Sequence, residues 1–69
     1  MSLPFTTEEM VDDYYASKKD AELCERAIIM NIDYPGLEYR ATTNRKIMET
    51  IREELERRGE LDRIKGAKP

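Results

Sequence analysis

Four acidic side chains near the start of the chain are its densest group of residues capable of chemistry. Glu8 and Asp12 are four residues apart, as are Glu9 and Asp13, so on a helix the four carboxylates share adjoining faces. Divalent cations bind such groups of oxygen atoms. The spacing lacks the loop geometry of a calcium site, and the helix dipole favours acidic residues near a helix start. We therefore expect these residues to form a solvated surface.

The other residue types give little support to catalysis. The sequence contains no histidine, which is the commonest general base near neutral pH and the commonest metal ligand. Cys24 is the only cysteine, and one thiolate alone does not make a zinc or iron–sulfur site. The three glycines are isolated, so no phosphate-binding loop is present. We expect no enzyme activity, no catalytic residues, no metal site and no cofactor.

A basic group in the second half of the chain is the strongest candidate for binding a ligand. The stretch GLEYRATTNRKI followed by REELERRGEL resembles the recognition helices of helix-turn-helix proteins, with a Thr-rich cap, Arg and Asn, an apolar stripe and a closing Gly. The resemblance implies that residues 43–46 face the major groove of DNA. The candidate contacts to nucleic acid or another anion are Arg40, Thr43, Asn44, Arg45 and Lys46.

The same arginines have a simpler interpretation as members of ion pairs along one helix. Acidic and basic residues four positions apart lie on the same side of a helix and attract each other weakly. This interpretation accounts for most of the arginines, and we favour it over DNA binding. The predicted pairs are Arg45–Glu49, Arg52–Glu56, Glu53–Arg57 and Glu54–Arg58.

Length and composition limit the size of the core. The chain has 69 residues, of which 39% are hydrophobic and 39% are charged. Chains this short bury only about 60% of their unfolded surface, so one core is marginal without disulfides, metal or oligomerisation. A single cysteine excludes an intrachain disulfide and suits a reducing compartment. We expect one small domain over residues 1–69 that is completed by a partner chain.

The charge and the hydropathy pattern exclude some classes of partner. The net charge is −3, with −5 in residues 1–34 and +2 in residues 35–69. An acidic protein is a poor general binder of polyanions. No apolar run approaches the roughly 20 residues of a membrane span, and the first ten residues do not form a secretory signal. We therefore expect a cytoplasmic protein that does not bind membranes.

The first half of the chain predicts a long helix over residues 6–31. Thr6 with Glu9 three residues later is a capping-box pattern. An apolar stripe then continues at alternating four- and three-residue spacing, which is typical of a helix that packs along one side. Ser17 followed by Asp20 is a second capping pattern, so two helices that break near Ser17 are the alternative. The stripe comprises Met10, Tyr14, Ser17, Ala21, Cys24 and Ile28.

The second half predicts a connection over residues 32–42 and a helix over residues 43–58. Pro35 and Gly36 indicate a turn, and Thr42 or Thr43 is expected to cap the helix. The alternation around Leu37 also permits a β-hairpin within residues 28–42. That helix–hairpin–helix layout is similar in outline to some small phage head-completion proteins. Gly59 is expected to end the helix, Leu61 and Ile64 to add a turn, and residues 65–69 to form a tail.

These patterns together predict an all-α fold. It is a helical hairpin, or a small three-helix domain, completed by dimerisation. The function we expect is a small non-catalytic protein-interaction module that self-associates through paired amphipathic helices, with another protein as a further partner. The alternative is a small DNA-binding regulator whose recognition helix spans residues 43–58. The predicted self-association seam comprises Tyr14, Ala21, Ile28, Met48, Ile51 and Leu55.

Overall fold

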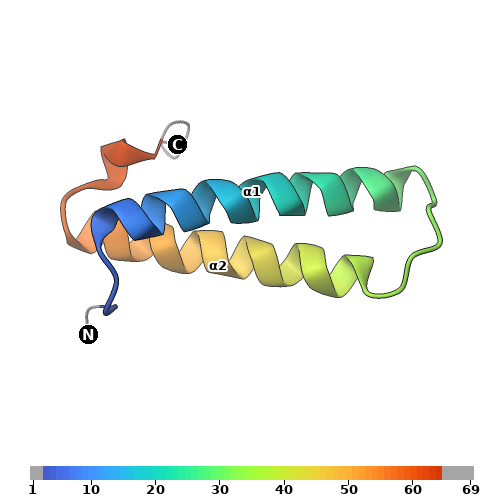
Figure 1. The fold of residues 1–69 in the computed structure, drawn as a ribbon, viewed down its shortest axis with the longest axis horizontal. Coiled ribbons are helices and arrows are strands. Elements are labelled where there is room, and N and C mark those ends of the chain that lie inside the picture. The colour runs from blue at the N-terminus through green and yellow to red at the C-terminus, as the bar shows by residue number, and fades with distance from the viewer. Residues whose placement is uncertain (1–2, 65–69) are drawn as a thin grey trace.

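A computed structural model describes residues 3–64, and its two long helices pack side by side (Figure 1). Helix α1 spans Thr7–Ile29 and helix α2 spans Leu37–Arg57, followed by a short 3₁₀ helix, η1, over Leu61–Arg63. The connection of residues 30–36 reverses the chain, so α1 and α2 are antiparallel. The predicted all-α helical hairpin is therefore confirmed.

Helix α1 begins with the predicted capping box. The Oγ1 atom of Thr6 accepts a hydrogen bond from the backbone N–H of Glu9 at 3.1 Å, and the N–H of Thr6 donates to Oε1 of Glu9 at 2.8 Å. The helix then continues to Ile29 without interruption. The alternative break near Ser17 is wrong, because Ser17 occupies a buried position in the apolar stripe and does not cap a second helix.

Both long helices end in the same motif, with a residue at positive φ just beyond the last turn. Asn31 has φ 58° after α1, and Gly59 has φ 73° after α2. The N–H of Glu60 then donates back to the carbonyl oxygen of Leu55 at 2.8 Å, and the equivalent bond after α1 measures 3.0 Å. These bonds satisfy carbonyl groups that a helix end would otherwise leave unpaired. The predicted stop at Gly59 is confirmed.

Helix α2 begins six residues earlier than predicted. It starts at Leu37, directly after Gly36 with φ 83°, so residues 37–42 are helical and Thr43 is not a cap. Leu37 and Ala41 are four residues apart and share one side of the helix, which outweighs the two-residue alternation. No strand occurs within residues 3–64, so the helix–hairpin–helix alternative is wrong. The similarity in outline to phage head-completion proteins depended on that hairpin, so it is wrong as well.

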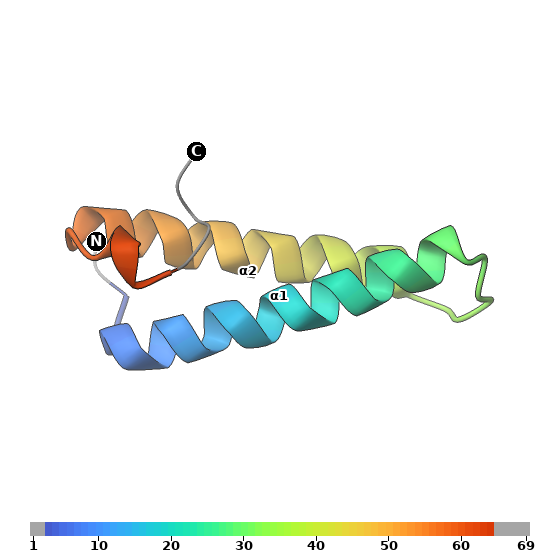
Figure 2. The same cartoon turned by 90° about the horizontal axis from the view of Figure 1, so that it is seen from above.

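The core is the seam between the two helices. Its large side chains lie toward the chain termini, whereas small ones lie toward the connection between the helices. The two helices cross at an angle, since they separate toward the termini in Figure 2 and toward the connection in Figure 1. The large buried residues are Met10, Tyr14, Met48, Ile51, Leu55 and Ile64, and the small ones are Ala21, Cys24 and Ala41.

The segments outside the long helices pack at the end of the hairpin near the chain termini. Ile64 is 1% exposed and Leu61 packs against the core, so the predicted extra turn is confirmed. The hydroxyl of Thr7 donates to Oε1 of Glu60 at 2.7 Å, which ties this turn to α1. Figure 1 shows η1 and the N-terminal segment on opposite sides of the hairpin. The predicted tail over residues 65–69 lies outside the described residues.

Candidate functional site

The seam divides the surface of the hairpin into two faces. Residues seven positions apart lie on the same side of a packed helix. We call the side on which η1 packs the covered face and the opposite side the open face. The covered face carries Glu25, Arg45, Glu49 and Arg52, and the open face carries Asp13, Asp20, Leu23, Arg40, Lys46, Ile47 and Thr50.

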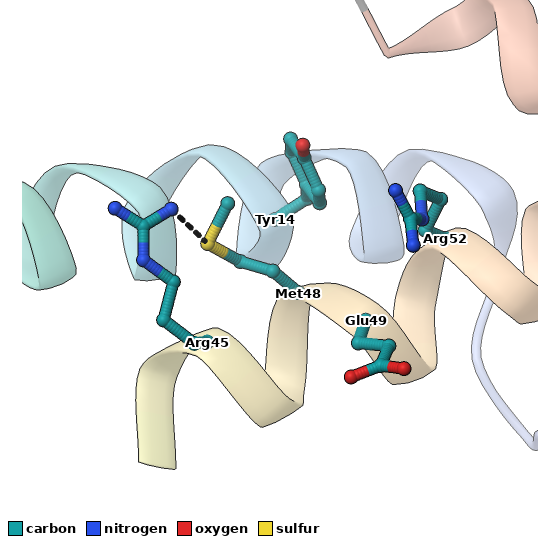
Figure 3. Close-up of a pocket in the computed structure, with 5 residues that line it drawn as sticks. All are labelled: Tyr14, Arg45, Met48, Glu49 and Arg52. Atoms are coloured by element: carbon teal, nitrogen blue, oxygen red, sulfur yellow. Dashed lines mark hydrogen bonds between the residues drawn. The ribbon is translucent and has the colours of Figure 1, made fainter. Parts of the chain in front are cut away.

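The covered face is polar where η1 leaves it exposed. Nε of Arg45 donates to Oε2 of Glu25 at 2.9 Å, and Nη2 donates to the other carboxylate oxygen. The hydrogen bonds from Arg45 hold the pKa of Glu25 below its usual range. Figure 3 shows Arg45 turned toward Met48, with Nη1 4.0 Å from the sulfur atom. A shallow hollow of about 390 Å³ lies here, lined by Tyr14, Arg45, Met48, Glu49 and Arg52.

A polar network crosses the seam on the open face. Arg40 donates to both carboxylate oxygens of Asp20, at 2.7 Å from Nε and 2.8 Å from Nη2. The side-chain amide of Asn44 donates to the same carboxylate. The bonds from Arg40, assisted by Asn44, lower the pKa of Asp20, although partial burial opposes them. This network fixes the register of the two helices on the open face.

An apolar hollow of about 310 Å³ lies on the open face near the chain termini. One acidic and one basic side chain, Asp13 and Lys46, stand beside it, and neither forms an ion pair with any other described residue. The hollow therefore has an apolar base and two charged side chains at its border that form no ion pair within residues 3–64. Its other lining residues are Leu3, Phe5, Met10, Ile47, Thr50 and Ile51.

A second apolar region of the open face lies near the connection between the helices. Leu23, Ile32 and Tyr34 are 53%, 50% and 60% exposed, respectively. They surround a hollow of about 310 Å³ that Asp20 and Arg40 border. We call these three residues the connection cluster. Solvent exposure of several large apolar side chains at one place is typical of an interaction site.

Glu54 is the most buried charged residue and has a structural role. Its carboxylate accepts hydrogen bonds from Nη2 of Arg57 at 2.7 Å and from Nε of Arg58 at 2.8 Å, and these bonds lower its pKa. Arg58 also donates to the carbonyl oxygen of Leu3 at 3.0 Å, so the network holds the N-terminal segment against α2.

Of the four ion pairs predicted within this helix, only Glu54–Arg58 forms; Arg45 instead pairs with Glu25.

The residues predicted to contact nucleic acid do not form a free basic patch. They lie within α2 and not at its start, so no unpaired backbone N–H groups accompany them. Arg40, Asn44 and Arg45 donate to carboxylates of α1, and Thr43 is half-buried. Lys46 alone of the five is an exposed cation without an ion pair among residues 3–64.

The residues of the predicted self-association seam all lie between the two helices of one chain. Ile28 is half-buried and the other five, Tyr14, Ala21, Met48, Ile51 and Leu55, are buried. Their role in self-association stays a prediction, because they already pack within the hairpin.

Cys24 is buried, as expected. Within the described residues, no three acidic or cysteine side chains come together in a group that could hold a metal ion.

Sequence reasoning did not group the apolar residues of the open face as one surface. Leu23 and Ile47 lie one position outside the four–three stripe, directly before Cys24 and Met48. Large apolar residues in this position next to a narrow seam are the available signal, since they widen the apolar surface toward one side only. Phe5, Ile32 and Tyr34 lie outside the helices, where helical periodicity gives no signal.

Comparisons with known proteins assign no relative to this fold or surface. No family model matches the chain, and neither the curated proteins nor the solved structures give a significant match. No helix in residues 3–64 is both long enough and apolar enough to cross a membrane.

Proposed function

We propose that this chain is a small non-catalytic protein-interaction module that pairs with a second copy of itself through the open face. The observation that carries the proposal is the exposure of Phe5, Leu23, Ile32, Tyr34 and Ile47, which form an apolar region at each end of one face. Water contact with this surface is unfavourable by about 25 cal/mol per Å² of apolar area, so a partner that covers it gains free energy.

The charges beside the apolar hollow support a second copy as the partner. Asp13 and Lys46 border the hollow, and neither forms an ion pair within residues 3–64. A face with both an acidic and a basic border is suited to a copy of itself, because a twofold axis can bring opposite charges together.

The test is the mass in solution, measured by light scattering on a sizing column over a hundredfold range of concentration. We expect a species of twice 8.1 kDa that dissociates on dilution. Ile47→Glu places a charge in the apolar hollow and should weaken the dimer at least tenfold. Ile29→Glu is the matched control, because Ile29 is 81% exposed and lies on the opposite side of α1 from Ala27, which lines the hollow at the connection cluster of the open face.

A wild-type chain that remains a monomer throughout this range would refute the proposal. An equal effect of the two variants would refute the assignment to the open face.

A further inference from the structure

The apolar hollow near the chain termini has two charges at its border that an occupant must match. Asp13 on α1 and Lys46 on α2 are exposed, and neither forms an ion pair within residues 3–64. The base of the hollow is apolar, with Met10 1% and Ile51 6% exposed. A surface that covers this base also removes water from the two charges, which costs free energy unless an opposite charge replaces the water. The occupant must therefore place a base beside Asp13 and an acid beside Lys46.

A second copy of the hollow meets this requirement by symmetry. Every copy carries the same acid and the same base at the same separation. A twofold axis that lies in the interface, perpendicular to the line joining Asp13 and Lys46, exchanges the two positions. Each carboxylate then faces an ammonium group of the other copy, whatever their separation within one chain. A different partner would need its own acid and base at a matching distance.

The apolar side chains of the hollow fit the same arrangement. Phe5 and Ile47 line the hollow and are 49% and 39% exposed, respectively. When two hollows face each other, both copies remove apolar area from water at the same contact. The two ion pairs then stand at the border of an apolar centre, which is the usual arrangement of a protein–protein interface.

The other acid and base of the open face are already paired with each other. Arg40 donates to both carboxylate oxygens of Asp20, at 2.7 and 2.8 Å, and Asn44 donates to the same carboxylate. These groups border the connection cluster. A partner gains little by competing for a carboxylate that already accepts two charge-assisted hydrogen bonds. The unpaired charges therefore favour an axis at the hollow near the termini.

We infer that two copies meet hollow to hollow, with the Asp13 carboxylate of each copy paired with the Lys46 ammonium group of the other. The twofold axis passes between these side chains, so α1 of one copy lies against α2 of the other at this point. The inference rests on the proposed function and assigns its interface to one ion pair that forms twice.

Charge reversal tests this pairing. Asp13→Lys places two bases at each hollow and Lys46→Asp places two acids there, so each variant alone should dimerise at least about tenfold more weakly than the wild type. A mixture of the two variants again sets an acid opposite a base at both contacts, and the heterodimer should recover that loss. Light scattering measures the affinity, and native mass spectrometry separates the heterodimer from the two homodimers by mass.

A chain that carries both reversals is the second test. Its acid and base are exchanged while its net charge stays that of the wild type. The inferred pairing predicts that this chain binds itself at least about tenfold more tightly than either single variant. If Asp13 and Lys46 met Arg40 and Asp20 of the other copy instead, the second reversal would weaken the dimer further.

The matched control reverses an acid and a base on the covered face. Glu49 and Arg52 border the shallow hollow there (Figure 3), and neither forms an ion pair within residues 3–64. Glu49→Lys and Arg52→Asp change the net charge by the same amounts as the open-face variants. Their mixture measures how far net charge alone favours a heterodimer, and the open-face mixture should exceed it.

Three outcomes overturn the inference. Equal affinity of the wild type and both single reversals would reject it and leave the dimer of the proposed function in place. Weakened single variants that recover neither in the mixture nor in the double variant would show that each charge meets a different group of the partner. A wild-type monomer at every concentration would reject the inference together with the proposed function.

Circular dichroism checks that each variant folds. Where a reversed chain does not fold, the neutral variants Asp13→Asn and Lys46→Gln take its place. The inferred pairing then requires that loss of both charges weakens the dimer no more than loss of either one, because each single change already removes both ion pairs. Additive losses would reject it.

Discussion

The covered and open faces flank the same seam but differ in how the chain finishes them. On the covered face, η1 follows α2 closely and brings Ile64 into the core, where it is 1% exposed. On the open face, the N-terminal segment covers only one end, and Ile47 remains 39% exposed. A two-helix core has two sides, and within residues 3–64 the segments outside the long helices close the covered face more fully than the open face. This difference is the basis for proposing that a partner covers the open face.

The largest expected difference between the faces is the loss of stability when an isoleucine is replaced by alanine. Ile64→Ala removes a fully buried side chain and should lower the free energy of unfolding by about 2–5 kcal/mol. Ile47→Ala should cost about 1 kcal/mol or less in the isolated chain, because much of that side chain already contacts water. Urea titration followed by circular dichroism measures both values, at a concentration where light scattering shows a monomer.

The comparison between the faces fails if the two alanine variants lose equal stability. Ile64→Ala could unfold so small a domain entirely, since domains of this size have about 3–10 kcal/mol of stability. Ile64→Val keeps the measurement in range, with an expected loss of about 0.5–1.5 kcal/mol.

A smaller expected effect is the loss of folding stability at acidic pH. The pKa values of Asp20, Glu25 and Glu54 are lowered in the folded chain from ordinary values of 3.8 for Asp and 4.5 for Glu. A carboxyl with a lowered pKa contributes stability that is fully present above its ordinary value and is lost as the pH falls through the folded value. We therefore expect the urea midpoint to be flat near neutral pH and to fall once the pH drops below about 4.5.

Single variants assign this acid dependence to each face. Asp20→Asn removes the carboxylate that pairs with Arg40 on the open face, so the urea midpoint of this variant should fall less at acidic pH. Glu25→Gln removes the carboxylate that pairs with Arg45 on the covered face and should reduce the acid dependence by a similar amount. The arginine partners of both carboxylates are substantially exposed, so each effect should be modest and should shrink in high salt. An unchanged acid profile in both variants would mean that these pairs do not stabilise the fold.

The smallest effect concerns the two interhelix arginines. Arg40→Ala and Arg45→Ala each remove a two-bond contact to a carboxylate of α1. Their effects on the stability of the isolated chain should be similar and smaller than that of Ile47→Ala. Only Arg40→Ala should weaken the proposed dimer, because Arg40 lies on the open face. Light scattering at matched concentrations checks this, and a weaker dimer for Arg45→Ala would point to the covered face instead.

The fold was largely predictable because one periodicity dominates the chain. The four–three stripe of α1 and the box formed by Thr6 and Glu9 place the first helix correctly. The start of α2 was missed because Thr42 and Thr43 resemble a cap, although the same spacing continues backward from Met48 through Asn44 and Ala41. Intrinsic capping preference was overridden by packing, since Ala41 faces α1 in the closed hairpin.

The candidate surface was less predictable, for a physical reason. Which flank of a narrow stripe stays exposed depends on where η1 and the N-terminal segment fold back. That choice is made by long-range contacts, such as Thr7 with Glu60 and Arg58 with the carbonyl of Leu3. Local periodicity carries no information about them. The acidic first half and basic second half did contain a usable signal, because Asp20–Arg40 and Glu25–Arg45 join them.

The short connection between the helices sets the order of events during folding. Residues 30–36 span the turn, and residues in the first turns on either side of it, such as Cys24 and Leu37, are close in sequence. A loop of this length closes in roughly 10–100 ns, and small helical proteins fold in microseconds to milliseconds. Each hairpin therefore forms before it meets a second one at micromolar concentration. In refolding experiments, an early phase independent of protein concentration should precede a slower bimolecular phase, and the slower phase alone should depend on the residues of the open face.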